Sequence, residues 1–522
     1  MPVKMRGGTG SIVGRRAPAF WGGCAAISLG VLLHLPMLSA EPGAAGHQHG
    51  MGMTMQSGAD PAMIAGMALI FIGVVAACYG ALSGERRRHG TAAGATYEAP
   101  DATPLNRPHA AVLAVLILGL VIDVMKPATL GFVMPGMAAE YGIAPATTAW
   151  LPFVALTGTT IGSFIWGWLA DRHGRRASIL LSTILFVSTS VCGAMPGFGG
   201  NLLMCFLMGC SAGGMLPVVY TLLAEIMPPR HRSWLLVLVG GTGLVGGYLA
   251  ASAAASLFEP WLGWRVLWLQ GFPTGLLLLA LARWIPESPR FLAEWGRTEE
   301  LAQMERKFGI VRREATRRPE RAQQEAGTGA LTAALSIAAL AWSFVNFGLL
   351  LWLPSDLRAR GYSAELASGI IASSALIALP TILLAAWLYS RWSSKWTLVA
   401  TIGLTLAGLL GALLPATMLG EPIVLVLVIA LLVVGTNGMI AVLLPYAAEN
   451  YPIGVRGRAT GLIAGSSKVG GVAVQGFALA GLIPTLSGAA LALVLPMAAS
   501  AVLVARAGRE TRGRSLSELE AG

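Results

Sequence analysis

The sequence predicts an all-α protein that is embedded in a membrane. Hydrophobic residues make up 55% of its 522 residues and charged residues only 12%, whereas a soluble chain carries roughly 25% charged residues. The apolar residues form long runs, and the positive charges gather in alternate gaps between these runs. This composition excludes a soluble enzyme, a disordered chain and a nucleic-acid-binding protein.

Fourteen apolar runs are long enough for helical membrane spans, which need about 20 residues each. Two runs precede a set of twelve, and a charged stretch divides the twelve into two sets of six. The strands of outer-membrane barrels are only about ten residues long, so that class is excluded. The runs cover residues 19–38, 62–83, 109–133, 146–170, 176–195, 201–220, 233–257, 263–285, 330–354, 362–388, 395–415, 421–445, 458–482 and 484–506.

The distribution of Lys and Arg predicts the orientation of these spans. When the N-terminus is placed inside and all fourteen runs cross, the inside segments hold 31 of the 36 Lys and Arg residues. The positive-inside rule therefore explains the net charge of +11 without nucleic acid. We expect a multi-pass protein of the cell inner membrane with both termini in the cytoplasm, acting as a monomer and without a cofactor.

Residues 1–100 form an extension before the twelve main runs. Its first run follows four basic residues, so it is either an uncleaved helix or a signal peptide cleaved near Ala40. Both interpretations place residues 41–60 outside. Histidines and methionines in this segment suit copper or zinc, although they also fit a flexible linker. The candidate metal ligands are His47, His49, Met51, Met53 and Met55.

The twelve main runs are expected to form two six-helix halves, residues 101–285 and 330–506. Residues 286–329 between them carry dense charges of both signs and are interpreted as a solvated amphipathic linker, and residues 507–522 form a tail. Two six-helix halves related by duplication are the plan of many secondary transporters, which hold their substrate between the halves.

An internal repeat supports this duplication. The pattern A-E-x-x-P-x-x-x-R occurs after the fourth run of each half, and Arg391 stands at the repeat position of Arg172. Chance similarity would not be expected to place such matches at equivalent points of both halves. The charged positions of the two pattern copies are Glu225, Arg232, Glu449 and Arg456.

The loop GWLADRHGRR, between the second and third main runs, resembles the G-x-x-x-D-R-x-G-R-R signature of the major facilitator superfamily. The resemblance implies a transporter whose two halves rock about a central site. We expect Arg175 and Arg176 to reach Glu225 when the cytoplasmic side is closed and to separate when it opens. The matching residues are Gly167, Asp171, Arg172, Gly174, Arg175 and Arg176.

Two further motifs resemble the sugar-porter and metabolite-symporter branch of this superfamily. The sequence PESPR, with Glu287 and Arg290, follows the sixth main run, and ETRGRSL, with Glu510, follows the last. Both motifs are expected to belong to gates, so they do not identify a sugar as the substrate.

The first main run contains two charges on which the functional prediction depends. Residues 121–135 resemble the D-G-[YF]-D-x-x-x-x-G-x-x-x-P pattern of aromatic-acid and organic-acid proton symporters, with Lys126 in place of the second Asp. Residues three apart share a helix face, and a bare charge inside a span is costly. Either Lys126 holds an anionic substrate while Asp123 takes the proton, or the two form a structural ion pair.

Other polar or aromatic side chains inside the runs are candidates for the lining of a central cavity. Trp342 stands at the repeat position of Asp123 and is suited to stack on an aromatic substrate. Asn346 and Asn437 are polar candidates, and Lys468 is expected to line the cavity, to snorkel or to pair with Glu449. Each of them also fits ordinary helix–helix packing.

We therefore predict a proton-coupled secondary transporter of a small organic solute, with an organic anion as the favoured class. Asp123 is the only acidic residue well inside any main run. The alternatives are a carrier of neutral metabolites or drugs, a sensor without transport activity on the same fold, and a metal-handling protein. No pattern G-x-x-x-x-G-K-[ST] occurs, so ATP-driven transport by this chain alone is excluded.

Overall fold

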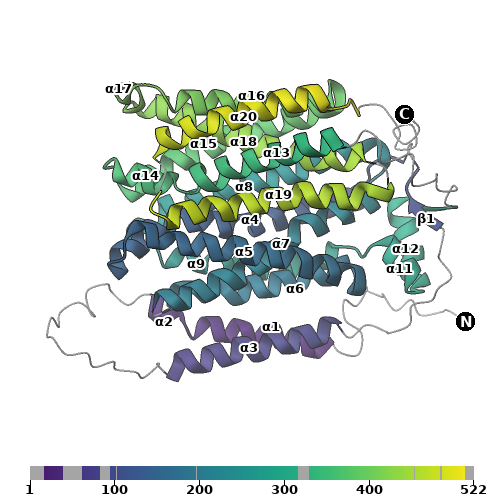
Figure 1. The fold of residues 1–522 in the computed structure, drawn as a ribbon. Helices are drawn as coiled ribbons and strands as arrows, with labels where there is room; N and C mark the ends of the chain where they lie inside the picture. Colours follow the sequence, from purple (N-terminus) through teal and green to yellow (C-terminus); the bar gives the residue numbers. More distant parts are fainter. Residues whose placement is uncertain are drawn as a thin grey trace, which may run out of the picture.

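The computed structural model describes residues 17–38, 61–82, 95–100, 103–195, 197–314, 329–451, 453–482 and 485–511, with the backbone alone at 17, 95–98, 313–314 and 453–458. Long helices lie side by side and run between two ends of the molecule (Figure 1). One end carries the short helices α11 (Pro289–Glu294) and α12 (Thr298–Phe308). We call it the linker end, and the opposite one the far end.

Helices α4 to α10 form the first half. Its longest helix, α4, begins at a capping box, in which the Asn106 side chain accepts a hydrogen bond from the backbone N–H of His109. The elements are α4 (Arg107–Tyr141), η1 (Pro145–Ala149), α5 (Trp150–His173), α6 (Arg175–Ser188), η2 (Thr189–Ala194), α7 (Phe198–Ile226), α8 (Pro229–Leu262), α9 (Val266–Leu269), α10 (Gly271–Leu281) and η3 (Ala282–Trp284).

Helices α13 to α20 form the second half. Its first long helix is interrupted by a turn of π-helix, η4, which continues into α14. The elements are α13 (Gly329–Val345), η4 (Asn346–Leu350), α14 (Leu353–Ala359), α15 (Ala364–Arg391), α16 (Ser394–Gly411), α17 (Ala416–Leu419), α18 (Pro422–Asn450), α19 (Ile453–Leu479) and α20 (Leu486–Ala507).

The two halves meet along helices from the middle of each. Helix α8 packs against α15 and α18, α5 packs against α19, and α4 packs against α14. Most of the large apolar side chains at these contacts are buried. The interface between the halves is therefore lined by α4, α5 and α8 on one side and by α14, α15, α18 and α19 on the other.

Within the described residues, thirteen helical segments are long and apolar enough to cross a membrane, one fewer than the fourteen predicted. The difference lies in the first run, 19–38. Helix α1 (Ala17–Leu32) has only 16 residues, and α2 (Leu35–Leu38) follows after a break. Pro36 lacks the N–H that a continuous helix would need there.

Helix α1 and helix α3 (Pro61–Leu82) pack closely on each other through small residues. A Cβ added at Gly23 would lie 2.6 Å from the backbone nitrogen of Ala77, so only glycine permits this approach. The pair contacts α6 and lies beside the main helices (Figure 1), on the side away from the interface between the halves. The proposed metal ligands of residues 41–60 lie outside the described residues.

The linker contains a feature that the sequence did not predict. Helix α12 is amphipathic as expected, because Leu301, Met304 and Phe308 are buried on one face. Beyond it, β2 (Val311–Glu314) pairs in antiparallel register with β1 (Ala95–Glu98) of the extension. The membrane helices agree with the all-α class, and this short two-stranded sheet is an addition to it that joins the extension to the linker.

Candidate functional site

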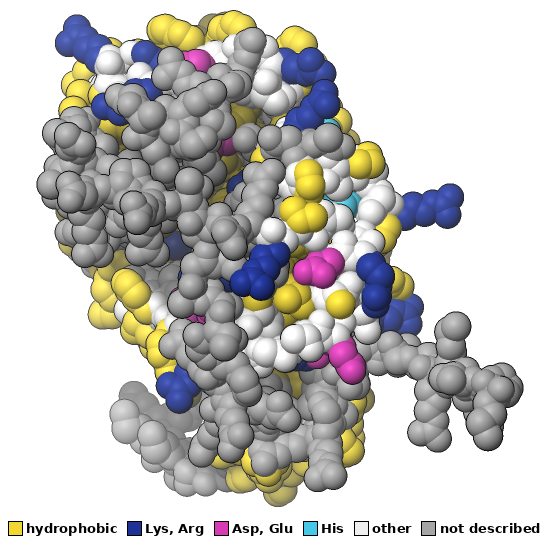
Figure 2. Space-filling model, turned by 90° about the vertical axis from the view of Figure 1, so that its right-hand side faces the viewer, with side chains coloured by type: hydrophobic (Ala, Val, Ile, Leu, Met, Phe, Trp, Pro, Cys, Tyr) yellow, Lys and Arg dark blue, Asp and Glu magenta, His cyan; other side chains and the backbone are white. Residues whose placement is uncertain are grey.

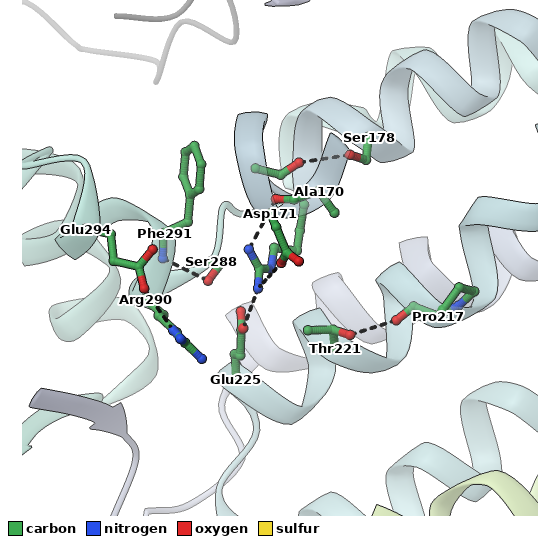
Figure 3. Close-up of polar contacts among 12 residues, drawn as sticks. Ala170, Asp171, Ser178, Pro217, Thr221, Glu225, Ser288, Arg290, Phe291 and Glu294 are labelled. Atoms are coloured by element: carbon green, nitrogen blue, oxygen red, sulfur yellow. Dashed lines mark hydrogen bonds and ion pairs between the residues drawn. The ribbon is translucent and has the colours of Figure 1, made fainter. Parts of the chain in front are cut away.

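A buried arginine organises the linker end of the first half. Nη2 of Arg175 lies 3.2 Å from Oε1 of Glu225 and 3.4 Å from Oδ1 of Asp171, and Nη1 donates to the carbonyl of Ala170 at 3.2 Å. Figure 3 shows Asp171 and Glu225 close to each other at this end of the first half. The motif loop is thereby tied to the end of α7, and the predicted contact between Arg175 and Glu225 is present.

Glu287 caps the first turn of α6. Its Oε1 accepts hydrogen bonds from the backbone N–H groups of Arg175 at 2.7 Å, Arg176 at 3.4 Å and Ser288 at 2.9 Å. Burial raises the pKa of this carboxyl group, while the backbone donors oppose the rise. A carboxylate at a helix N-terminus also interacts favourably with the helix dipole.

Gly174 is required where the motif loop meets Glu287. Its φ of +99° and ψ of 159° belong to a region that side chains rarely adopt. A Cβ at this position would also lie 2.6 Å from Cδ of Glu287. The glycine of the motif therefore permits both the turn into α6 and the cap on it.

The other motif residues of this end have weaker contacts. Asp171 is 80% exposed, and Arg172 lies over the ring of Trp168 at 5.4 Å. A Cβ at Gly167 would meet nothing within 4 Å. These side chains are therefore placed at the surface, and Gly167 has no close contact that explains a glycine.

Arg176 and Arg290 form their hydrogen bonds with groups other than Glu225, although the charge of Arg290 acts on Glu225. Arg176 donates from Nη2 to the carbonyl of Ala282 at 3.1 Å, which links α6 to η3. Nε of Arg290 pairs with Oε1 of Glu294 at 3.0 Å, one turn further along α11 (Figure 3). The expectation that Arg176 reaches Glu225 is therefore not met, because its guanidinium group donates to η3 instead.

At the linker end of the second half, two carboxylates accept hydrogen bonds mainly from hydroxyl groups. Oε2 of Glu449 accepts hydrogen bonds from the hydroxyls of Tyr389 at 2.7 Å and Thr511 at 2.8 Å. Glu510 accepts from the backbone N–H of Ser394 at 2.9 Å and from the hydroxyls of Ser393 and Ser394. Glu510 thus caps α16 as Glu287 caps α6.

Three further arginines were predicted to belong to the gates. Arg391 is exposed at the end of α15, and Arg232 is half-buried in the first turn of α8. The side chain of Arg456 lies outside the described residues. A gating role for these three residues stays a prediction.

The structural ion pair of Asp123 and Lys126, one of the two alternatives left open by the sequence, is not formed. Nζ of Lys126 is fully buried and donates to the carbonyl of Phe186 at 2.7 Å and to Oγ1 of Thr189 at 2.6 Å. It also lies over the Phe186 ring at 4.6 Å. Lys126 therefore points into the first half, toward α6, because its long side chain reaches neutral acceptors there.

The charges of Asp123 and Lys468 of α19 attract each other across the interface between the halves, without a direct hydrogen bond or close ion pair between the two side chains. Asp123 lies sixteen residues beyond the start of α4 at Arg107, and Lys468 fifteen residues beyond the start of α19 at Ile453. A rise of 1.5 Å per residue puts both at about 22 to 24 Å from these ends. The carboxylate is buried, and the lysine is half-buried.

Two hydrogen bonds bring further candidates to this level. Nε1 of Trp342 donates to the carbonyl of Thr436 at 2.9 Å, and Oγ of Ser343 donates to the carbonyl of Ser467 at 2.5 Å. Thr436 directly precedes Asn437, and Ser467 directly precedes Lys468. Helix α13 thus contacts α18 next to Asn437 and α19 next to Lys468. We call Asp123, Trp342, Asn437 and Lys468 the central layer.

The π-helical turn η4 borders the central layer. It begins at the half-buried Asn346, and such turns are frequent at functional sites. Nε2 of Gln475 donates to the carbonyl of Phe347 at 2.7 Å, and the hydroxyl of Tyr248 donates to that of Leu350 at 3.1 Å. Side chains of α19 and α8 thus satisfy two carbonyls of the turn.

A small apolar cavity lies beside this turn. Its volume is about 30 Å³, and Pro127, Leu156, Met208, Phe347 and Leu351 are among its lining residues. That space suits about one water molecule and is too small for an organic solute. Transport therefore requires the halves to move apart from this arrangement.

A buried ion pair joins the halves at the far end. Nη2 of Arg358 in α14 lies 2.5 Å from Oε1 of Glu259 in α8, and the two side chains are 20% and 7% exposed. Nearby, Oγ of Ser256 donates to the carbonyl of Glu365 at 3.3 Å. We call Glu259 and Arg358 the far-end pair.

Sequence reasoning missed the far-end pair and the partner of Asp123. Glu259 and Arg358 stood at the ends of predicted spans, which would have indicated outer-side charges but not that they pair. Lys468 was considered as a cavity residue, as a snorkelling residue or as a partner of Glu449, but not as a partner of Asp123. The signal that could have found it is that Asp123 and Lys468 are charges of opposite sign that both lie well inside their predicted spans.

Comparison with known proteins agrees with this arrangement. Residues 113–475 match the Major Facilitator Superfamily. The niacin transporter NiaP of Acinetobacter baylyi is 27% identical over 439 residues, covering 80% of this chain and 97% of that protein. The 4-hydroxybenzoate transporter PcaK of the same organism is 27% identical over 426 residues, covering 77% and 91%.

A solved structure shares the fold. The partially occluded, inward-open xylose transporter XylE from E. coli superimposes with a TM-score of 0.62 at 18% identity, covering 78% of this chain and 99% of that one. The match to the family spans most of the chain, and the helical architecture agrees with it. The chain therefore belongs to the Major Facilitator Superfamily, a family of multi-pass membrane transporters rather than enzymes.

Proposed function

We propose that this protein is a proton-coupled carrier of a small aromatic carboxylate. Niacin and 4-hydroxybenzoate, the solutes named for two relatives, are both aromatic rings that carry one carboxylate. The observation that carries the proposal is the central layer, where an acid and a base from different halves attract each other and the buried Trp342 stands at the repeat position of the acid.

Asp123 is the proposed proton carrier. It is the only acidic residue well inside the main spans, and it lies where the two halves meet. Intramembrane carboxylates commonly form proton relays in transporters. Because its charge interacts with a residue of the other half, its protonation state changes the attraction between the halves, which is what coupling to alternating access requires.

The orientation that we propose places the linker end in the cytoplasm. Figure 2 shows that Lys and Arg side chains gather on this face of the molecule. That distribution supports an inner-membrane protein by the positive-inside rule. The far-end pair then closes the outer side.

Uptake into liposomes tests this function. The purified protein is reconstituted, and uptake of labelled nicotinate and 4-hydroxybenzoate is measured with and without an inward proton gradient. We expect accumulation above the external concentration only with the gradient, and its loss when a protonophore is added. Uptake that is indifferent to the gradient would contradict proton coupling, and preferential uptake of neutral analogues would favour a carrier of neutral metabolites.

A further inference from the structure

Lys468 is a positive charge inside the membrane, and the charge of Asp123 in the other half attracts it. We propose that Lys468 binds the carboxylate of the transported substrate, and that the substrate replaces Asp123 as its partner. This inference rests on the proposed function and adds to it the residue that selects an anion. The sequence had suggested Lys126 for this role.

The contacts of the two intramembrane lysines separate their roles. Lys126 is fully buried, and two of its donors are used by Phe186 and Thr189 within the first half. Lys468 is only half-buried, and the charge that acts on it comes from Asp123 across the interface. A substrate that binds between the halves can therefore replace Asp123 beside Lys468 without breaking a hydrogen bond within either half.

The surroundings of Lys468 fit an aromatic acid. On α19, the next turn places Gly471 against the ring of Phe347, where a Cβ would lie 2.8 Å from Cδ2. The ring of Phe347 lies 5.7 Å from that of Trp342 in an edge-to-face arrangement. A cation beside an aromatic pair provides a charge for the carboxylate and apolar surface for the ring.

Charge balance explains how the substrate and the proton would move together. Without substrate, Asp123 and Lys468 balance each other across the interface. A substrate carboxylate adds a second negative charge, and an uncompensated charge in this low-dielectric layer is strongly unfavourable. Protonation of Asp123 removes the excess, so one proton enters with each monocarboxylate and the step carries no net charge.

A comparison of an acid with its amide tests the assignment. Binding of nicotinate and nicotinamide to the purified protein is measured by competition with labelled nicotinate, for the wild type and for Lys468→Gln, Lys468→Arg and Lys126→Gln. We expect Lys468→Gln to reduce the preference for the acid by about tenfold or more, because a charge-assisted hydrogen bond is lost. Lys468→Arg should retain it, and Lys126→Gln should leave the ratio near the wild-type value.

The outcomes separate this inference from the proposed function. An unchanged acid-to-amide ratio in Lys468→Gln, or a collapsed ratio in Lys126→Gln, would overturn the assignment while carboxylate transport stands. A wild-type protein that neither binds nor transports aromatic acids would instead overturn the function. If the amide binds too weakly for a ratio, the nicotinate affinities of the two glutamine variants decide, with retained affinity in Lys468→Gln counting against the assignment.

Discussion

The two ends of the molecule use their charges differently. At the far end, Glu259 and Arg358 form a buried ion pair that joins the two halves directly. At the linker end, the pairs Arg175–Glu225 and Tyr389–Glu449 each lie within one half. The far-end contact therefore holds the halves together, whereas these linker-end contacts fix the shape of each half separately.

The linker end also differs between the halves. Glu225 and Glu449 occupy equivalent positions of the internal repeat, but Glu225 contacts a guanidinium group and Glu449 contacts two hydroxyls. The caps Glu287 and Glu510 are more alike, since both accept from the first turn of the helix that follows the motif loop. The two halves thus share carboxylates at equivalent positions, but the partners of these carboxylates differ.

Breaking the far-end pair should have the largest effect on conformation. Glu259→Gln leaves Arg358 buried without its counter-charge, which costs about 3 kcal/mol or more for a buried pair. Only the state closed at the far end bears this cost, so its population should fall roughly a hundredfold relative to the open state. The measurement is labelling of a cysteine at position 252, on the same face of α8, by a membrane-impermeant maleimide in a background without the native cysteines.

Glu140→Gln is the matched control for this experiment. Glu140 pairs with Arg265, but both residues belong to the first half, so the bond does not depend on how the halves are arranged. Labelling at position 252 should rise in Glu259→Gln and stay at the reference level in Glu140→Gln. Equal labelling of all three proteins would show that the far-end pair does not hold the halves together.

Gly174→Ala should destabilise the linker end of the first half. The substitution places a side chain in an unfavourable backbone region, at a cost of about 1–3 kcal/mol, and brings Cβ against Glu287. We expect a lower melting temperature in detergent. Gly167→Ala in the same motif is the control, and it should be neutral or slightly stabilising because alanine favours a helix; a similar loss in both variants would contradict this account.

Tyr389→Phe should weaken the second half by a smaller amount. It removes one hydrogen bond to the carboxylate of Glu449, worth about 1.5–3 kcal/mol for a charged acceptor, and the remaining donor Thr511 reduces the loss. Tyr446→Phe, which removes a bond to the neutral carbonyl of Arg509, should cost less. Thermal unfolding of both variants measures the order, and the reverse order would show that the Glu449 cluster is not the stronger contact.

Asp171→Asn should have the smallest effect on stability. The carboxylate is 80% exposed, and exposed ion pairs contribute about 0–1 kcal/mol. The melting temperature of this variant should therefore match that of the wild type within error, at low and at high salt. A clear salt-dependent loss would mean that Asp171 contributes more to the Arg175 cluster than its exposure indicates.

Local patterns were sufficient to predict much of this structure. The apolar runs predicted the long helices, because a span of about 20 apolar residues has few alternatives. The motif and the internal repeat predicted the contact between Arg175 and Glu225, since both residues occupy fixed places next to helix ends. The linker was expected to be amphipathic, and α12 is.

Features that depend on distant parts of the chain were not predictable in this way. The spacing of Asp123 and Lys126 left an ion pair or separate roles open, and only the packing of distant elements decided between them: Lys126 reaches acceptors on α6 and η2, while Asp123 faces the charge of Lys468 on α19. The far-end pair joins residues 99 positions apart in the sequence. Likewise, β1 and β2 pair across more than two hundred residues, where neither strand has a strong pattern of its own.

Proton uptake driven by the substrate tests the central claim most directly. Liposomes that contain a pH-sensitive dye and the wild-type protein should acidify inside when nicotinate is added outside, without creating a membrane potential. Asp123→Asn should abolish this acidification while exchange of labelled nicotinate for unlabelled nicotinate continues, because exchange needs no net proton transfer. Acidification by Asp123→Asn at the wild-type rate would contradict the account, since Asp123 would then not be the proton carrier.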